Sequence, residues 1–265
     1  MSEIVLRNIK NKGKEAVAED KKPSAEEAAV AAEKQQKKDE PARMSMMAQL
    51  TDVDVGLVEE ALLSDYARPV AEGGCGKFNL DRKGLFNKRT ELDKILSYKK
   101  DLIKKSLLVL PSSMNNEAVQ SFKNIVSFMG DRTTRKDTGG HASKLLKNTL
   151  HAPEDLRDEI FCQIMKQVTN NADPNSTKKG WQLFAICSGT YPPSKELQPY
   201  MMYFCESHKN DENPEIADLA AQVQKRIFRT QEQGPRINVP TTVEIEAVRH
   251  GHPVACRVQK LDGSA

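Results

Sequence analysis

A thiol and a hydroxyl stand side by side in the stretch GWQLFAICSGTYPPS, at Cys187 and Ser188. Both groups serve as nucleophiles in covalent catalysis, but each needs a general base that a third group orients. His141 and His151 fall in segments that we interpret as polar loops, so neither is a convincing base. We therefore predict that the protein is not an enzyme and has no catalytic residue, with a nucleophilic Cys187 as the alternative.

The same stretch has the pattern of a buried helix. Trp181, Phe184 and Cys187 recur every three residues, which places them on one face of a short helix over WQLFAICSG. A free cysteine often packs as a small hydrophobic residue. Pro192 and Pro193 then form a rigid corner before the next helix. The chemistry that we expect here is packing.

Two further patterns point to ligands but are incomplete. Cys205 and His208 have a C-x-x-H spacing, and no second half-site follows at the spacing of a zinc site. The segment GGCGK has part of a phosphate-binding loop, but that pattern needs a glycine where Ala71 stands and a serine or threonine where Phe78 stands. We predict neither a metal site nor a cofactor.

Basic residues gather in short clusters between residues 99 and 179. The chain as a whole is nearly balanced, because 40 basic and 37 acidic residues leave a net charge of +3, and few aromatic residues lie among the clusters. Both features argue against a nucleic-acid partner. The candidate partner-binding residues are Lys99, Lys100, Lys104, Lys105, Arg132, Arg135, Lys136, Lys144, Lys147, Lys178 and Lys179. They indicate a surface for acidic partners, with an ordinary solvated face as the alternative.

The bulk properties predict a soluble cytoplasmic protein. No apolar run among the 265 residues is long enough for a signal peptide or a membrane span, so any membrane contact should be peripheral. The five cysteines are odd in number and scattered, as is common in a reducing compartment.

Hydrophobic periodicity predicts an all-α fold, a compact bundle of about six to eight helices. The clearest helix is NEAVQSFKNIVSFMG, which has one apolar face and a glycine stop at Gly130. We interpret DRTTRKDTGGHAS and NNADPNSTKKG as a polar loop and a turn. Further helices are expected over residues 51–66, 90–111, 143–151, 152–170, 181–189, 195–207 and 214–228.

Composition divides the chain into successive regions. Residues 1–50 form a charged, alanine-rich arm that we expect to be disordered or semi-helical, and residues 51–77 a short helix and a Gly-rich linker. The helical domain spans residues 78–233. Residues 234–265 have a capping-box pattern at Thr241 and Glu244, then an alternation typical of a first β-strand.

The helical region resembles the myosin tail homology 4 domain of unconventional myosin tails, a plant kinesin and some motor-less adaptors. The runs that carry the resemblance are ILSYKKDLIKKSLLVLP, AVQSFKNIVSFMGDR, LRDEIFCQIMKQVTNN and GWQLFAICSGTYPPSKELQPYMMYF. The signature residues of the family pattern fall at Arg157, Asp158, Glu159, Gln163, Gly180, Trp181, Cys187, Pro192 and Pro193.

The resemblance implies a non-catalytic module that binds the cytoskeleton or cargo in a motor tail, most simply that of an unconventional myosin. It implies that residues 234–265 are a linker and the beginning of a truncated, ubiquitin-like first lobe of a FERM domain. Microtubules, through tubulin tails, or cargo peptides are then the expected partners, and actin only indirectly, through a motor domain absent from this sequence. Arg157, Asp158 and Glu159 would form inter-helix ion pairs and caps.

Other classes of protein remain as alternatives. One is a kinesin-type or motor-less adaptor. Another is a helical membrane-trafficking adaptor that binds acidic peptides or anionic lipids through the same basic faces.

Overall fold

The computed structural model describes residues 56–66, 77–79 and 94–252. Apart from an isolated antiparallel bridge between Phe78 and Leu108, its regular elements are helices. They are α2 (Leu63–Tyr66), α4 (Ser112–Met129), α5 (Thr138–Thr149), α6 (Glu154–Val168), α7 (Pro174–Ser188), α8 (Gln198–Glu206), α9 (Pro214–Gln233) and α10 (Thr242–His250). Six of these helices, α4 to α9, lie between residues 78 and 233, which confirms the predicted all-α bundle. The predicted arm, the Gly-rich linker up to Gly76 and the C-terminal strand lie outside the described residues.

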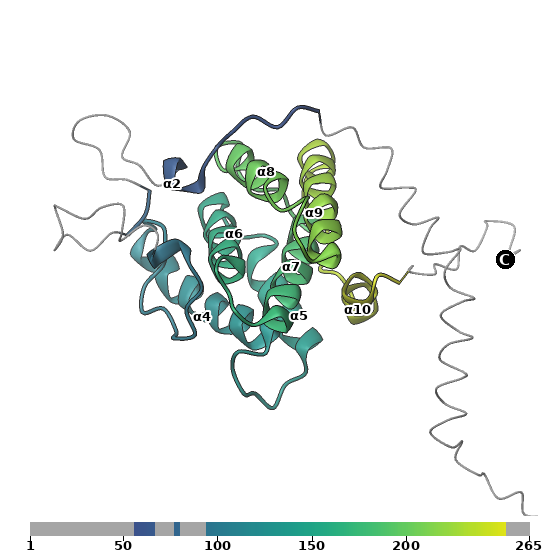
Figure 1. Ribbon diagram of the computed structural model, residues 1–265. Helices are drawn as coiled ribbons and strands as arrows, with labels where there is room; N and C mark the ends of the chain where they lie inside the picture. The colour runs from purple at the N-terminus through teal and green to yellow at the C-terminus, as the bar shows by residue number, and fades with distance from the viewer. Residues whose placement is uncertain (1–55, 67–76, 80–93, 253–265) are drawn as a thin grey trace, which may run out of the picture. The chain divides into compact units, whose positions relative to one another are not determined.

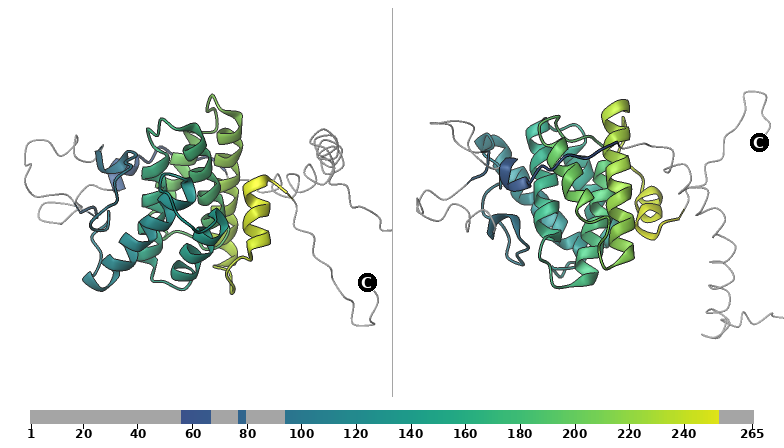
Figure 2. Two further views of the ribbon diagram at one scale, coloured as in Figure 1. Left: turned by 90° about the horizontal axis from the view of Figure 1, so that it is seen from below. Right: turned by 45° about the horizontal axis from the view of Figure 1, so that its top comes forward.

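Helix α7 packs on α4, α6, α9 and α10, so it has neighbours on several sides (Figure 1). Helix α5 packs between α4 and α10, and α8 covers α9 and α2. Both views in Figure 2 place α10 beyond α9, on the side away from α2. The bundle therefore extends into α10, which follows the expected domain boundary at residue 233.

Helix α6 is the most buried element. Every residue from Asp158 to Val168 is buried, including charged and amide side chains. This helix lies within the range predicted for it, residues 152–170, and its polar as well as its apolar positions are buried because α4 and α7 both pack on it. The expected burial of the Trp181 helix is also confirmed. The Trp181 ring is fully buried and stacks on Phe204 with 5.7 Å between ring centroids.

The predicted caps at three helix ends are present. Gly130 ends α4 with φ 90°, a left-handed conformation that glycine adopts without strain. Asn213 caps α9 by accepting the Glu215 N–H at 3.0 Å. Thr241 and Glu244 form both hydrogen bonds of a capping box at the start of α10.

Three helices, α4, α5 and α7, begin several residues earlier than predicted, and two of them begin within segments interpreted as a turn and a loop. Helix α7 starts at Pro174, within the expected turn, because the Asp173 carboxylate accepts N–H groups of the first turn and Pro174 has a helical φ. Helix α5 starts at Thr138, within the expected loop, because Asp137 accepts the Gly140 N–H at 3.2 Å. In both cases an aspartate N-cap outweighs the loop-like composition that follows it.

The helix predicted over residues 51–66 is wrong for residues 56–62, and only α2 forms. Gly56 has φ 68°, a left-handed conformation that interrupts a helix. Leu57 is 94% exposed, so the apolar face that would stabilise a longer helix is not buried.

Gly180 marks a close helix crossing and provides a test of the packing. A Cβ at this position would lie 2.5 Å from Cγ1 of Val168 and 3.0 Å from Cε of Met129. We predict that Gly180→Ala lowers the free energy of unfolding by about 1–3 kcal/mol, even though alanine is the better helix former. Urea denaturation followed by Trp181 fluorescence measures the change. Adding Val168→Ala removes the clashing methyl, so the double variant should be less destabilised than the sum of the single variants. Additive effects within about 0.5 kcal/mol would contradict this account.

Candidate binding surface

The lysines at positions 99, 100, 104 and 105 lie on an irregular stretch and not on a helix. Of the described part of the helix predicted over residues 90–111, only residues 94–96 are helical, and residues 97–111 follow a non-helical path. All four lysines are exposed. We call residues 99–105 the basic segment.

The C-terminal end of α6 anchors the start of this segment. The Gln167 side chain pairs with the backbone of Lys99, accepting its N–H at 3.3 Å and donating to its carbonyl at 3.2 Å. The Tyr98 N–H donates to the Thr169 carbonyl at 2.8 Å. The backbone of residues 98–99 is therefore bound to α6 through three hydrogen bonds.

Lys166 strengthens the same anchor from inside the bundle. Its ammonium donates to the Ser97 carbonyl, and the residue is only 3% exposed. Burial, together with the nearby charge of Lys99, lowers the pKa of Lys166 to about 8. The sequence analysis missed this residue, because a lysine between apolar helix positions gives no sign that it is buried.

A buried carboxylate anchors the other end of the basic segment. Glu159 of α6 is fully buried, and its two oxygens accept the N–H groups of Leu107 at 2.8 Å and Leu108 at 2.7 Å. Gln163 donates to Glu159 at 2.7 Å and to the Ala118 carbonyl of α4 at 3.0 Å. Burial raises the pKa of Glu159 to about 7, while these three hydrogen bonds to the carboxylate oppose the rise.

These two anchors explain why the predicted helix does not form. In a helix, the N–H groups of Leu107 and Leu108 would donate hydrogen bonds to the backbone carbonyls four residues earlier. The carboxylate that binds them lies more than 50 positions away in the sequence. Local periodicity carries no information about such a partner.

The basic segment runs antiparallel alongside α4 and begins near the basic loop that follows this helix. The Tyr98 hydroxyl hydrogen-bonds the Asp131 carboxylate just after α4, and the Ser106 N–H donates to Asn115 near its beginning at 2.9 Å. Arg132 follows Asp131 directly and is exposed. The start of the basic segment, at Lys99 and Lys100, therefore lies at the same end of α4 as Arg132.

Arg135, Lys136, Lys144 and Lys147 extend this surface over the loop and α5. All four are exposed. His141, expected in a polar loop, is instead a buried residue of α5 whose Nε2 lies 2.8 Å from the Thr134 hydroxyl. Burial lowers the pKa of His141, and the surrounding charges of Lys136, Arg132 and Lys144 lower it further.

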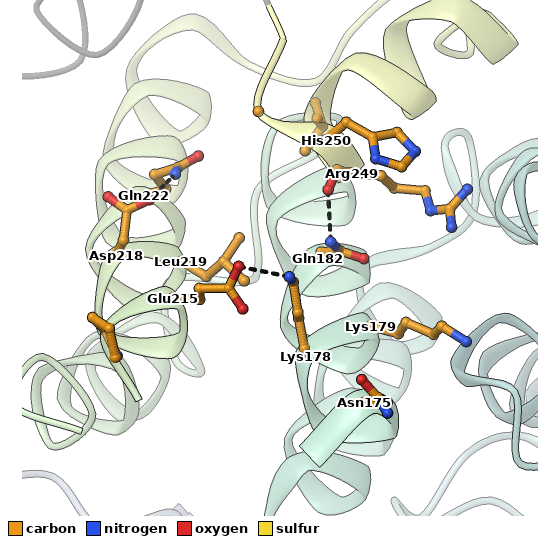
Figure 3. Close-up of a pocket in the computed structure, with 13 residues that line it drawn as sticks. Asn175, Lys178, Lys179, Gln182, Glu215, Asp218, Leu219, Gln222, Arg249 and His250 are labelled. Atoms are coloured by element: carbon orange, nitrogen blue, oxygen red, sulfur yellow. Dashed lines mark hydrogen bonds and ion pairs between the residues drawn. The ribbon is translucent and has the colours of Figure 1, made fainter. Parts of the chain in front are cut away.

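The two lysines of α7 have different surroundings (Figure 3). Lys179 points away from α9, and its ammonium lies 3.1 Å from where a Cβ on Gly130 would sit, at the end of α4. Lys178 points across a groove of about 600 Å³ between α7, α9 and α10 and pairs with Glu215 at 2.6 Å. Lys179 therefore adds to the basic surface near α4, and Lys178 does not.

Most of these cations lack acidic partners. Lys99 is 3.8 Å from Asp101, and Lys178 is neutralised by Glu215. The following residues form no ion pair with any described residue: Lys100, Lys104, Arg132, Arg135, Lys136, Lys144, Lys147 and Lys179. The resulting surface has a net positive charge and is open to solvent.

The signature acids of α6 hold backbone segments in place, and the expected inter-helix ion pairs are wrong. Asp158 accepts the Ser194 N–H at 2.9 Å and so fixes the corner after Pro193. Arg157 pairs within its own helix, with Glu154 at 3.9 Å. These residues stabilise non-helical chain against the bundle.

The corner at Pro192 and Pro193 is also held from α9. The Gln231 side chain donates to the Pro193 carbonyl at 2.8 Å, and the Arg236 N–H donates to the Thr190 carbonyl at 2.9 Å. The corner that the sequence predicts is therefore bound to α6, to α9 and to the chain after α9.

The candidate nucleophile is inaccessible. Cys187 is fully buried, and burial raises its pKa to about 12, so its thiolate is scarce at neutral pH. Within the described ranges, no group of histidine, cysteine or acidic residues could hold a metal ion. None of the described helices is both long and apolar enough to span a bilayer.

Comparison with known families matches this architecture. The family model for the MyTH4 domain, the myosin tail homology 4 domain, matches residues 142–247. The chain contains a MyTH4 domain. MyTH4 domains of myosin and kinesin tails are non-catalytic protein-binding modules, and the matched region here includes α6, α7 and the first part of α10.

The relatives are motor proteins of two classes. The chain is 34% identical to human unconventional myosin-XVB over 175 residues, which cover 65% of this chain and 5% of the relative. It is also 34% identical to the kinesin-like protein KIN-14E of Arabidopsis thaliana over 218 residues, which cover 77% of this chain and 17% of the relative. The chain thus spans a small part of each relative.

Solved structures agree with this assignment. The MyTH4-FERM MF1 domain of Dictyostelium discoideum myosin VII (mutant 2) superimposes with a TM-score of 0.64 at 27% identity, over 77% of this chain and 40% of that one. The C-terminal MyTH4-FERM domain of human myosin 7b, solved in complex with the harmonin-a PDZ3 domain, gives a TM-score of 0.54 at 31% identity, over 59% of this chain and 32% of that one.

The Glu159 anchor predicts a pH-dependent stability. Because the pKa of Glu159 is raised from 4.5 to about 7 in the fold, the folded protein binds more protons than the unfolded chain between these values. The free energy of unfolding should therefore fall as pH rises from 5 to 7.5. In Glu159→Gln this fall should be smaller, and the lost acceptor should cost about 1–3 kcal/mol at pH 5. Urea denaturation across this pH range measures both effects. Glu212→Gln, at an exposed site, should keep the wild-type slope, and an equal slope in Glu159→Gln would refute the assignment.

Burial of the thiols predicts their reactivity. Cys162, Cys187 and Cys205 are all buried, whereas Cys75 and Cys256 lie outside the described residues. In a Cys75→Ser/Cys256→Ser background, we expect no labelling by a maleimide at pH 7.5 in native buffer and three labels per chain in urea. Intact-mass spectrometry counts the labels. Rapid labelling of Cys187 in the native protein would support the nucleophile hypothesis instead.

Proposed function

We propose that this chain is the non-catalytic partner-binding part of a motor-protein tail, and that its basic surface binds acidic protein segments such as the C-terminal tails of tubulin. The observation that supports the proposal is that exposed cations from two parts of the chain, Lys100 and Arg132, lie at the same end of α4. The start of the basic segment and the loop after α4 meet there through the contact of Tyr98 with Asp131.

The two anchors on α6, Gln167 and Glu159, hold the backbone of the basic segment in place, which favours binding of a partner. Side chains presented on a fixed backbone lose less conformational freedom on binding than side chains on a mobile chain. Glu159 and Gln167 fix the backbone on either side of Lys100 and Lys104. An acidic partner can then contact these cations without first ordering the chain.

We infer the class of the parent motor from the relatives. An unconventional myosin is the preferred parent, with a kinesin or a motor-less adaptor as the alternative, because both motor classes align over most of this chain. In this proposal the protein acts at the cytoskeleton in the cytoplasm. A FERM domain after residue 252 would share in cargo binding, as in the MyTH4-FERM proteins of similar structure.

Charge reversal in the basic segment tests the partner. In Lys99→Glu/Lys100→Glu/Lys104→Glu/Lys105→Glu, we expect microtubule affinity to fall at least tenfold, because attractive charges become repulsive. Co-sedimentation with taxol-stabilised microtubules at low salt measures the affinity. Binding by the wild type should also weaken between 50 and 200 mM salt, where the screening length shortens to roughly 7 Å.

Two kinds of control are needed. One distinguishes an effect of charge from a loss of fold, and the other distinguishes binding to microtubules from binding to lipid. Replacing the same four lysines by arginine keeps the charge and should keep the affinity. Removing the tubulin tails with subtilisin should abolish binding by the wild type. Flotation with vesicles of anionic lipid tests the membrane alternative. The tubulin assignment is abandoned if wild-type protein stays in the supernatant or if the quadruple glutamate variant binds as well as wild type.

A further inference from the structure

A second hollow lies on a different part of the bundle, with the opposite charge. It has a volume of about 520 Å³ and opens between the first turn of α6, residues 108–110 and the corner at residues 194–196. Glu154 and Asp155 of α6 form one wall, and both are exposed.

The hollow already holds one ammonium group of the chain itself. The Lys77 ammonium sits over the Tyr66 ring, 4.7 Å from its centroid, and pairs with Glu196. An aromatic face and a carboxylate around one cation are a combination that proteins use to bind lysine and arginine side chains. Lys77 occupies only part of the space, because the cavity volume extends to Glu154 and Asp155.

Asp158 leaves a buried acceptor at this cavity. It is 4% exposed and lines the hollow. One carboxylate oxygen accepts the Ser194 N–H at 2.9 Å, and the other accepts the Tyr66 hydroxyl at 3.5 Å, the outer limit of a hydrogen bond. A buried carboxylate oxygen that lacks a strong hydrogen bond costs free energy. A hydrogen-bond donor that enters the hollow can bind this oxygen and recover part of that cost.

We propose that this hollow is a docking site for a basic segment of a protein partner, which places an arginine or lysine side chain against Glu154, Asp155 and Asp158. The volume lies within the range of sites that enclose a side chain and part of its backbone. Val109 is 53% exposed on the rim and can pack on an apolar neighbour of the basic residue. The absence, among the described residues, of any acidic or histidine group able to hold a metal favours an organic cation over a metal ion.

The site carries a charge opposite to that of the surface near α4, so the two surfaces select different partners. Acids outnumber bases in the lining of the hollow, even though Lys77 pairs with Glu196 and Arg157 with Glu154 at 3.9 Å. The charged lining residues are Lys77, Glu154, Asp155, Asp158, Lys195 and Glu196. A positively charged partner is attracted to the hollow and repelled by the basic segment of residues 99–105. The domain can therefore hold an acidic and a basic partner without competition between them.

Peptide binding tests the proposal. The probe is the fluorescein-labelled peptide Gly-Ala-Arg-Leu-Arg-Ala-Gly, and its partner probe has citrulline, which keeps the shape but lacks the charge, in place of both arginines. Fluorescence anisotropy should show binding of the arginine peptide to the wild type and at least tenfold weaker binding of the citrulline peptide. Glu154→Gln/Asp155→Asn should weaken the arginine peptide at least tenfold. Amide NMR shifts at Val109 and Ser194 upon addition of peptide give a readout that needs no variant.

A matched variant controls for net charge. Glu212→Gln/Glu232→Gln removes the same number of charges at exposed sites outside the hollow and the basic segment and should bind the peptide as the wild type does. Circular dichroism melting checks that both double variants fold. Equal binding of the citrulline peptide, unchanged binding by Glu154→Gln/Asp155→Asn, or no binding to the wild type overturns the proposal. Equally strong competition by spermine would also overturn the proposal, because it would mark a polyamine site. A dimer in sedimentation velocity that Glu154→Gln/Asp155→Asn dissociates would overturn it as well, because a second copy of the chain would then be the occupant.

Discussion

A single buried carboxylate determines how the non-helical part of this domain meets its helices. Glu159 lies in the middle of α6 with no basic partner among the described residues, and backbone N–H groups of Leu107 and Leu108 satisfy it instead. A buried carboxylate that lost these donors would leave acceptors with no water to bind. The path of the chain before α4 is therefore set by the need to bring two peptide groups to this side chain. The neighbouring acid, Asp158, does the same for the corner at Ser194.

The helices themselves follow from local sequence. Apolar spacing, Gly130 and the capping residues Asn213 and Thr241 predict α4, α9 and α10 closely, because the forces involved act within one or two turns. The early starts of α5 and α7 also had a local signal, an aspartate N-cap, which the loop-like residues after it concealed. The family signature around Trp181 likewise identified the fold, because its residues are those that the tight crossings of α7 require.

The binding surface was only partly predictable. Exposure of the lysines follows from composition, and the sequence correctly marks Lys100 and Arg132 as solvent-facing. Their proximity depends on Tyr98 reaching Asp131 and on Gln167 binding Lys99, contacts that span 30 to 70 positions and leave no periodic trace. The different surroundings of Lys178 and Lys179 could not be predicted either. Adjacent positions on a helix point in different directions, and the tertiary fold determines which neighbours they meet. The hollow beside α6 was missed for a further reason, because its lining comes from five separate stretches of chain.

The two anchors of the basic segment also determine how the domain resists pulling. Gln167 and Glu159 lie eight residues apart on one rigid helix, about 12 Å along its axis. Under the proposed function, a partner that pulls on residues 100–104 loads both anchors, and the hydrogen bonds on either side share the force. The force then passes directly into α6, the helix most enclosed by its neighbours.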